Sequence, residues 1–594
     1  MPTLAYWQGR TKEQAQLHTW LRDTAVPLIG IYGLGGFGKS TLAARVYEDS
    51  TQKDSPQDSP QDSAQDSTQD SAQGSAPFVG QFWADLSQTL GFPDVARRAL
   101  FAWGMPAEEV AAFEETQLPT ALVRRLGSGA YLLVLDNLES VLTEQDEWQS
   151  VAYRQFFEAF LRTAGASKVL LTSRNRLPGL PARWLALTEG LTSVEGAALL
   201  SQKGVLGSDA ERQSVSERVG GYPLSLVLIA GWLLAEEPAD PQVRYLPGDL
   251  WALEGRYQGA RQLSVEAVFG WSVGRLEERL RQVLWQLSIL RQPFSATTAA
   301  AVAPDQNPSE ADLRQLDRRA LLQLLPEQDR DGQRRFRWQA QVRELAQRRA
   351  GDQSAAHERA IRHFAGRVQP LQQAQENQRQ TETDQLQDYL EVFHHLCELG
   401  GYGAALGWLT QETQAGETYS SCDFWMQLSG YNDLREALYR RLVEEWRPQD
   451  EERRGYGYAQ EKLGDVLQFL DQREAAIALY DEAIATYQQV GDRLGYANAL
   501  CSRASLLDDA AAALEAFQQA QQIYIDINHP YSQARNLILY ICRAQAALGQ
   551  VDSAIDSLQQ AAAIGEAIGV EMVVQYAQQR IAELQESDDQ AQEP

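Results

Sequence analysis

The sequence predicts a multidomain α/β and α protein, with a parallel sheet domain followed by a helical domain, a winged helix and an α-solenoid of helical hairpins. Three observations favour this class. A glycine-rich loop joins an apolar run to a helical pattern near the N-terminus, further apolar runs alternate with helical patterns up to residue 191, and the C-terminal part repeats one helical pattern. The length of 594 residues is enough for about four domains.

The glycine-rich loop is the most specific motif. It follows the apolar run LIGIY at 28–32, which is typical of a buried parallel strand, and it fits G-x-x-x-x-G-K-[ST]. Glycines have no Cβ, so they let backbone N–H groups turn toward an anion without a steric clash. The glycines of this loop are Gly33, Gly35, Gly36 and Gly38. Lys39, Ser40 and Thr41 then open a helix; the lysine can reach the β- and γ-phosphates, and the Ser40 hydroxyl can bind Mg²⁺. The motif therefore predicts ATP or ADP and Mg²⁺ as cofactors.

Residues 50–75 repeat the pattern Q-D-S-x and contain almost no apolar side chains. Such a segment cannot offset the entropy of its own ordering, so we expect a disordered surface insertion between the helix of the loop and the next strand. The sequence allows two roles for this insertion, a tolerated expansion or a regulatory cluster of serines.

Further apolar runs complete the expected sheet, at 77–87, 130–137, 167–174 and 183–191. Helical patterns lie between them, so residues 1–191 are predicted to form an open α/β domain. Ligands of such domains bind at the carboxyl ends of the strands, where Asp136, Ser173 and Arg174 are expected.

Asp136 follows four apolar residues, which is the pattern of a Walker B strand. Its carboxylate is predicted to hold Mg²⁺, directly or through water, so Ser40 and Asp136 are the expected metal residues and Asp136 is a catalytic one. Many ATPases have a second acid at the next position, but Asn137 stands there, and an amide cannot accept a proton at neutral pH. Glu139 is near enough to substitute, and slow hydrolysis is the expectation.

The remaining chain is predicted to be helical, with one hairpin. Residues 192–262 form a helical domain around GGYPLSLVLIAGWLL, and residues 263–350 contain helices and two strand-like runs around Asp331-Gly332, which indicates a winged helix. Residues 351–450 are expected to be a helical linker or repeat-like region, and residues 451–590 the repeats.

The repeats align the segments 479–491, 516–528 and 557–569. The matched positions are Tyr480, Phe517 and Leu558, then Ala483, Ala520 and Ala561, and at the helix ends Gly491, Asn528 and Gly569. Their spacings of 37 and 41 residues lie near the period of about 34 that tetratricopeptide hairpins have. Such arrays stack into a superhelix with a concave face, which predicts a protein partner; a plain helical bundle is the alternative.

The charge of the chain argues against two classes of partner. With 80 acidic and 53 basic side chains the formal net charge is −27, so nonspecific attraction to nucleic acid or to an anionic membrane is disfavoured. The cysteines lie far apart and the histidines match no motif, so neither a zinc site nor a disulfide framework is expected. The sequence has no signal peptide and no apolar run of about 18 residues, and we expect a cytoplasmic protein.

The ordered motifs over about residues 5–350 resemble the STAND class of signalling NTPases, close to the NB-ARC ATPases of apoptotic and plant immune proteins. The segments that carry the resemblance are YWQGRTKEQAQLHTWL, GLGGFGKSTLA, LLVLDN, KVLLTSR and GGYPLSLVLIAG. The resemblance implies that Arg10 belongs to the family's N-terminal Gly-Arg pair, that Arg174 contacts the γ-phosphate, and that Pro223 packs against adenine. In FRWQAQVRELA, Gln339 stands where the family usually has a histidine that contacts the ADP β-phosphate, and an amide carries no charge.

The resemblance also implies a function. ADP would hold the sheet domain, helical domain and winged helix closed, and exchange for ATP would let them rotate apart so that the chain forms a homo-oligomer. The repeats would sense or bind a protein partner. Two other functions stay open: a nucleotide-independent repeat scaffold, and a winged-helix DNA-binding regulator that uses Arg330, Arg334, Arg335 and Arg337.

Overall fold

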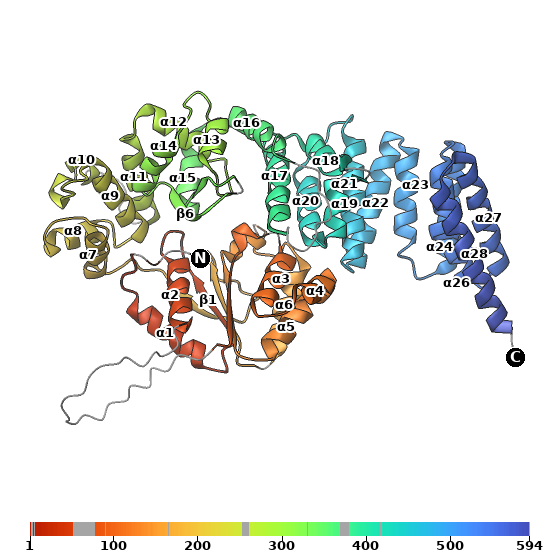
Figure 1. Cartoon of the computed structure of the whole chain (residues 1–594), viewed down its shortest axis with the longest axis horizontal. Coiled ribbons are helices and arrows are strands. Elements are labelled where there is room, and N and C mark those ends of the chain that lie inside the picture. The colour runs from red at the N-terminus through yellow and green to blue at the C-terminus, as the bar shows by residue number, and fades with distance from the viewer. Residues whose placement is uncertain are drawn as a thin grey trace. The chain divides into compact units, whose positions relative to one another are not determined.

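The computed structural model describes residues 1, 4, 6–51, 78–89, 91–143, 145–163, 165–251, 261–329, 331–368, 379–415 and 418–592. These residues form two compact units, unit 1 over Met1–Leu399 and unit 2 over Gly400–Pro594 (Figure 1). Almost all of the predicted Q-D-S insertion lies outside the described residues. The predicted fold class is confirmed, while the finer domain limits drawn from the sequence stay a prediction.

The sheet of unit 1 is parallel, with the strand order β2-β3-β4-β1-β5. Its strands are β1 (Leu28–Tyr32), β2 (Gly80–Asp85), β3 (Tyr131–Asp136), β4 (Lys168–Ser173) and β5 (Arg183–Ala186). Every residue of β3 and β4 is buried, which is the property of central strands that helices cover on both faces.

Helices flank this sheet on two sides (Figure 1). The helices are α1 (Thr11–Arg22), α2 (Lys39–Thr51), α3 (Phe92–Ala102), α4 (Ala107–Ala112), α5 (Leu118–Gly127) and α6 (Val151–Arg162). One apolar core joins α3, α5 and α6 to the strands, with Phe92, Leu122 and Phe156 against Leu133 and Val169. Burial of these side chains is the main stabilising contribution in such a core, and it fixes the positions of the strand ends.

The chain then forms a helical segment that returns to the sheet. Its main helices are α7 (Ser193–Gln202), α8 (Asp209–Arg218), α9 (Pro223–Glu236) and α10 (Gly248–Trp251). Gly221 has φ +64°, and a Cβ there would lie 1.9 Å from the Leu191 carbonyl oxygen, so only glycine fits before α9. Leu191 in turn donates its N–H to the Gly221 carbonyl, which fixes where α9 begins.

A winged helix follows, as predicted. It contains α11 (Arg261–Gly274), α12 (Glu278–Leu287), α13 (Ala296–Val302), α14 (Glu310–Arg318), β6 (Gln323–Gln328), β7 (Arg334–Arg337) and α15 (Ala340–Ala350). β6 and β7 are antiparallel. Three arginines of the suggested DNA-binding cluster have partners within unit 1: Arg334 pairs with Glu310, Arg335 donates to the Pro293 carbonyl and Arg337 donates to Gln323. Arg330 lies outside the described residues.

Two helices end unit 1, α16 (Ser354–Ala365) and α17 (Arg379–Glu398). They bring together a buried histidine and charged groups. His395 is fully buried, and its Nδ1 lies 2.9 Å from Nδ1 of His357. The pKa of His395 is lowered to about 2, mainly by burial and in part by the neighbouring His357, Arg291 and Arg343. The buried ring at position 395 is therefore neutral at ordinary pH.

Unit 2 is almost entirely helical. Its elements are α18 (Tyr402–Thr410), β8 (Thr413–Ala415), β9 (Thr418–Ser420), α19 (Cys422–Leu428), α20 (Asn432–Glu445), α21 (Arg453–Phe469), α22 (Arg473–Val490), α23 (Arg493–Ala504), α24 (Ala510–Asp526), α25 (Pro530–Asn536), η7 (Leu537–Ile541), α26 (Cys542–Ala547), α27 (Val551–Ile568) and α28 (Glu571–Gln592). Consecutive helices pack as hairpins, which matches the predicted repeats. η7 is a π-helical turn inside a continuous helix that runs from residue 530 to 547.

The aligned repeat positions have equivalent environments. Ala483, Ala520 and Ala561 are each fully buried, and Gly491, Asn528 and Gly569 all adopt positive φ where their helices end. The alignment read from the sequence therefore identifies the packing core of the array. Of the described helices, none is long and apolar enough to cross a membrane.

Candidate nucleotide-binding site

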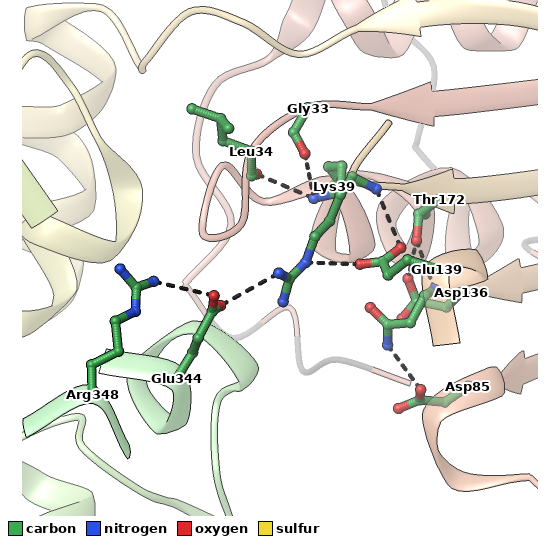
Figure 2. Close-up of polar contacts among 11 residues, drawn as sticks. Gly33, Leu34, Lys39, Asp85, Asp136, Glu139, Thr172, Glu344 and Arg348 are labelled. Atoms are coloured by element: carbon green, nitrogen blue, oxygen red, sulfur yellow. Dashed lines mark hydrogen bonds and ion pairs between the residues drawn. The ribbon is translucent and has the colours of Figure 1, made fainter. Parts of the chain in front are cut away.

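The candidate site lies at the carboxyl end of the parallel sheet. The glycine-rich loop follows β1, Asp85 ends β2, Asp136 ends β3 and Arg174 follows β4. Because parallel strands share one carboxyl edge, the fold brings these side chains together from positions more than 100 residues apart. Figure 2 shows this region, with Lys39, Asp136, Glu139 and Thr172 close to one another.

The loop has the backbone geometry that its glycines allow. Gly36 and Gly38 have φ of +74° and +85°, a region that other residues rarely adopt. A Cβ at Gly38 would meet nothing within 4 Å, so this residue is required for its conformation and not for close packing. Gly38 immediately precedes Lys39, where α2 begins, and Thr41 is the third residue of that helix.

Lys39 is buried, with 8% of its surface exposed. Its Nζ donates to the carbonyl oxygens of Gly33 at 2.8 Å and Leu34 at 3.1 Å, as Figure 2 shows. Burial lowers the pKa of Lys39, Arg174 lowers it further, and Glu139 and Asp136 oppose this shift. A buried ammonium group next to an anion-binding loop is well placed to exchange these carbonyl partners for phosphate oxygens.

Asp136 is also buried, with 3% exposure. Burial raises the pKa of its carboxyl to about 6, although side-chain hydrogen bonds with Ser40 and Thr172 act in the opposite direction. Ser40, at the start of α2, is therefore in contact with the acid that ends β3. A hydroxyl and a carboxylate that meet in this way are suitable oxygen ligands for Mg²⁺.

Two further residues position the end of β3, and neither was predicted from the sequence. Thr172 of β4 donates its hydroxyl to Asp136 and accepts the backbone N–H of Asn137 at 3.0 Å. Asp85 accepts the Asn137 amide at 2.8 Å and is paired in register with Asp136. Thr172 could have been found as the polar residue before Ser173 in a buried strand, whereas Asp85 needed the strand order.

Arg174 lies among carboxylates. Its backbone N–H donates to Glu139 Oε2 at 3.2 Å, its Nε lies 3.3 Å from Glu139 Oε1, and its Nη1 lies 3.4 Å from Glu344 Oε2. Glu139, considered from the sequence as a possible water-polarising acid, is therefore engaged by Arg174. Glu344, on α15 of the winged helix, has no counterpart among the residues predicted from the sequence.

Arg10 is buried beneath the loop. It adopts a left-handed backbone with φ 59°, and its guanidinium donates to the carbonyl oxygens of Glu189 at 2.7 Å and Phe37 at 3.5 Å. Its own N–H donates to Glu195, the acid of the capping box that starts α7. Arg10 thus joins the phosphate loop to the first helix of the helical segment.

Pro223 is the first residue of α9 and is partly buried. The residue before it, Tyr222, makes the close approach: its hydroxyl donates to the Gly35 carbonyl, and its ring centroid lies 4.5 Å from that of Phe37. Tyr222 is fully buried, and burial raises the pKa of its hydroxyl to about 12. The aromatic residue next to Pro223 therefore supports the loop from the side of α9.

Gln339 and Gln341 occupy different environments at the start of α15. Gln339 is the exposed N-cap residue, and its side chain makes no capping hydrogen bond. Gln341 is buried, and its Oε1 accepts the Tyr222 hydroxyl at 3.3 Å. A Cβ added to Gly36 would lie 2.6 Å from this Oε1 atom, so Gln341 is the winged-helix amide next to the loop.

The chemistry of the collected groups fits a magnesium nucleotide. The loop offers backbone N–H groups and a buried ammonium, and Ser40 with Asp136 offers oxygen ligands for a cation. Among the described residues, no cluster of three or more histidine, cysteine or acidic side chains could hold a metal by itself. Mg²⁺ commonly takes one or two protein oxygen ligands and completes its coordination with water and phosphate oxygens, which suits the pair of Ser40 and Asp136.

Sequence comparison places the chain near plant immune proteins. It is 26% identical over 341 residues to an uncharacterized WD repeat-containing protein of Nostoc sp., over 54% of this chain and 25% of that protein. It is 23% identical over 227 residues to the disease resistance protein RPP13 of Arabidopsis thaliana, over 36% of this chain and 24% of that protein. A probable disease resistance RPP8-like protein of the same plant is 27% identical over 162 residues. The expected resemblance to plant immune proteins is therefore confirmed.

The matches cover only part of the curated relatives. The chain spans about a quarter of the length of the first two curated relatives, and no family model matches it. The structure is also similar to that of a Signal Transduction ATPase with Numerous Domains protein with a tetratricopeptide repeat sensor from Pyrococcus horikoshii. That likeness has 15% identity and a TM-score of 0.41, and it covers 99% of this chain and 81% of the other.

Proposed function

We propose that the chain is a signalling NTPase of the STAND type, in which exchange of ADP for ATP at the glycine-rich loop changes the contacts among the parts of unit 1. In this proposal ATP binding leads to self-association, and the hairpins of unit 2 sense or bind a protein partner. The nucleotide acts as a conformational switch, and its hydrolysis is slow.

One observation carries this proposal. Three segments that are far apart in the sequence meet at the loop: Gly35 and Gly36 of the loop itself, Tyr222 before α9, and Gln341 of α15. A loop that only bound a nucleotide would not need a helical segment and a winged helix against its glycines. Because both segments contact the loop, a ligand that changes the loop has a direct route to both.

In this proposal each residue of the site has a separate role at the nucleotide. Loop N–H groups and Lys39 hold the phosphates, Ser40 and Asp136 hold Mg²⁺, and Arg174 interacts with the terminal phosphate. Bound Mg²⁺ would neutralise phosphate charge. Thr172 holds the Asp136 carboxylate in place. Asn137, which donates to Asp85, can orient a water but cannot take its proton, and this supports slow turnover.

A matched pair of buried lysines tests nucleotide binding. We expect Lys39→Met to abolish the response to nucleotide, because methionine keeps the apolar stem but has no ammonium group. Wild-type protein at about 100 times the dissociation constant of ATP–Mg²⁺ should gain roughly 2.7 kcal/mol of stability. The measurement is thermal unfolding of the full chain with and without ATP–Mg²⁺.

Lys168 provides the control. It lies in β4 with 2% exposure, and its Nζ also donates to two backbone carbonyls, of Asp23 at 2.6 Å and Val26 at 2.9 Å. We expect Lys168→Met to lower the melting temperature and to retain the full shift with ATP–Mg²⁺. Equal nucleotide shifts in wild type and Lys39→Met would overturn the proposed site.

The proposed nucleotide-dependent self-association is tested by the mass of the protein in solution. We expect the full chain to have one mass with ADP and a larger one with a slowly hydrolysed ATP analogue, measured by light scattering at matched concentrations. The Lys39→Met variant should have the same mass in both. If wild-type protein binds both nucleotides and its mass does not change, self-association is excluded and the nucleotide site remains.

A further inference from the structure

A residue of the winged helix contacts the arginine that follows β4. Glu344 lies in the middle of α15, one turn after Gln341. Its Oε2 is 3.4 Å from Nη1 of Arg174, and its Oε1 is 3.1 Å from Nη2 of Arg348 on the same helix. Figure 2 shows Glu344 between Arg348 and the polar groups at the end of the sheet.

The two carboxylates on Arg174 hold it in unequal ways. Glu139 is engaged twice, by the backbone N–H of Arg174 at 3.2 Å and by its Nε at 3.3 Å. Glu344 is engaged once, through Nη1, and it has a second partner in Arg348. Of the two contacts, the one with Glu344 costs less to break, since Glu344 keeps an ion pair after losing Arg174.

The charges around the loop make this contact sensitive to a third phosphate. Arg174, Glu139 and Asp136 all lie close enough to Lys39 to affect its protonation. A terminal phosphate bound near Arg174 would add negative charge beside Glu344 and would also offer stronger hydrogen-bond acceptors to the guanidinium. ADP ends at the β-phosphate, so it would add neither the negative charge beside Glu344 nor the hydrogen-bond acceptors for Arg174.

We propose that Glu344 competes with the γ-phosphate for Arg174 and thereby determines how strongly the site prefers ADP over ATP. This inference rests on the proposed function. Bound ATP displaces Glu344 from Arg174, and α15 loses its ionic contact with the sheet domain; bound ADP leaves the contact in place. Glu344 is a specificity-determining residue in this scheme, and it does not take part in chemistry.

The expected effect is modest. The side chains of Arg174 and Glu344 are 44% and 41% exposed, so water and salt screen their attraction. Loss of an exposed ion pair changes an affinity by about two- to five-fold. We expect Glu344→Gln to raise the affinity for a slowly hydrolysed ATP analogue by about this factor and to leave ADP affinity within about two-fold, so that the affinity ratio changes.

Two control variants separate this effect from a general loss of charge. Glu358 is an exposed acid on α16, and Glu358→Gln removes the same charge elsewhere in unit 1. We expect it to leave the ratio unchanged. Arg348→Gln removes the alternative partner of Glu344 and leaves Arg174 as its cation, so we expect the ratio to move toward ADP.

The measurement is equilibrium titration of the full chain with fluorescent ADP and with the ATP analogue, at 50 mM and 500 mM salt. The difference between wild type and Glu344→Gln should shrink at high salt, because the contact is partly exposed. Hydrogen exchange of residues 340–350 gives a second readout: the analogue, but not ADP, should raise exchange there in wild type. An unchanged affinity ratio in Glu344→Gln at low salt would overturn the inference while nucleotide binding stands, whereas absence of binding in wild type would overturn the proposed function itself.

Discussion

Tyr222 in unit 1 and Tyr487 in unit 2 have similar surroundings. Both are buried, and each ring lies against a glycine: a Cβ would come within 3.0 Å of the Tyr222 ring at Gly36 and within 2.4 Å of the Tyr487 ring at Gly495. Each hydroxyl also donates a hydrogen bond. Burial raises the pKa of both hydroxyls, so neither ionises near neutral pH.

The two tyrosines differ in what they connect. Tyr222 donates to the backbone of Gly35, which lies 187 residues earlier, in the glycine-rich loop. Tyr487 of α22 donates at 2.8 Å to Glu461, which lies 26 residues earlier in α21, the other helix of the same hairpin. The same packing unit of a tyrosine and a glycine therefore connects distant segments in unit 1 and neighbouring helices in unit 2. In unit 1 a ligand of the loop can act on the contact, while in unit 2 the contact belongs to the repeat core.

The largest expected effect concerns the partner of Tyr487. Glu461 is buried, and burial raises the pKa of its carboxyl from 4.5 to about 7, with a further contribution from Asp465. Because the pKa in the folded state lies above the ordinary value, ionisation costs stability, and the loss grows as the pH rises from about 4.5 past 7. We expect unit 2 to lose about 2–3 kcal/mol between pH 5 and pH 8, and Glu461→Gln to remove this loss.

Hydrogen exchange of peptides from α21 and α22, corrected for the intrinsic effect of pH, measures this change in the full chain. Glutamine can still accept the Tyr487 hydroxyl, so the hairpin keeps its hydrogen bond. Glu482→Gln, at an exposed position of α22, is the control and should behave like wild type. Equal pH dependence in Glu461→Gln and wild type would show that the buried carboxyl does not set the stability of this hairpin.

A smaller effect is expected at the glycine beside Tyr487. Gly495→Ala places a methyl group 2.4 Å from the ring edge, in a position where the ring is held by neighbouring helices. Overpacking of this kind costs about 1–3 kcal/mol, and the better helix propensity of alanine returns up to about 1 kcal/mol. We expect a lower denaturant midpoint for unit 2.

The control for this variant is Gly407→Ala in α18. A Cβ at Gly407 meets nothing within 4 Å, so alanine should be neutral or slightly stabilising there. If Gly495→Ala and Gly407→Ala shift the denaturant midpoint by the same amount from wild type, Tyr487 moves freely enough to accept the methyl group.

The smallest expected effect is a loss of stability in unit 1 as the pH falls, which is opposite to the pH dependence expected for unit 2. The pKa of His395 in the folded state lies below its ordinary value of 6.5, so the ring stays neutral and its contribution to stability is complete above that value. As the pH falls from 7.5 to 5.5 the unfolded chain gains a proton that the folded chain excludes. Unit 1 should lose about 1 kcal/mol in this step.

The groups that face this ring come from several elements: His357 of α16, His394 and Glu391 of α17, Arg291 after α12, and Arg343 of α15. We expect His395→Asn, which has a polar edge but no proton to gain, to reduce the loss in peptides of α16 and α17. In the same pH step unit 2 should become more protected, because Glu461 returns to its neutral form. Loss of protection from hydrogen exchange in both units would contradict the opposite pH dependences that we assign to His395 and Glu461.

The features that the sequence predicts correctly are those that depend on local spacing. The glycine-rich loop, the strand that ends at Asp136 and the alanine positions of the repeats all follow from fixed intervals along the chain. Glu344 and Asp85 were missed, because their positions near the loop depend on how segments pack. The helix α15 is an example of a feature that sequence spacing alone does not determine. Gln339 and Gln341 are two residues apart, and the start of the helix at Ala340 determines which of them faces the loop.

The π-helical turn η7 has a consequence for how the array tolerates changes in length. An i→i+5 turn takes up more residues than an α-helical turn without breaking the helix. The helix from residue 530 to 547 is longer than α23, which has 12 residues, and the π turn contributes about one of the extra residues. The longer helix accounts for the wider spacing of 41 between Phe517 and Leu558. The additional length lies within a helix and not in an exposed loop, so it adds no exposed segment of the kind that proteases cut.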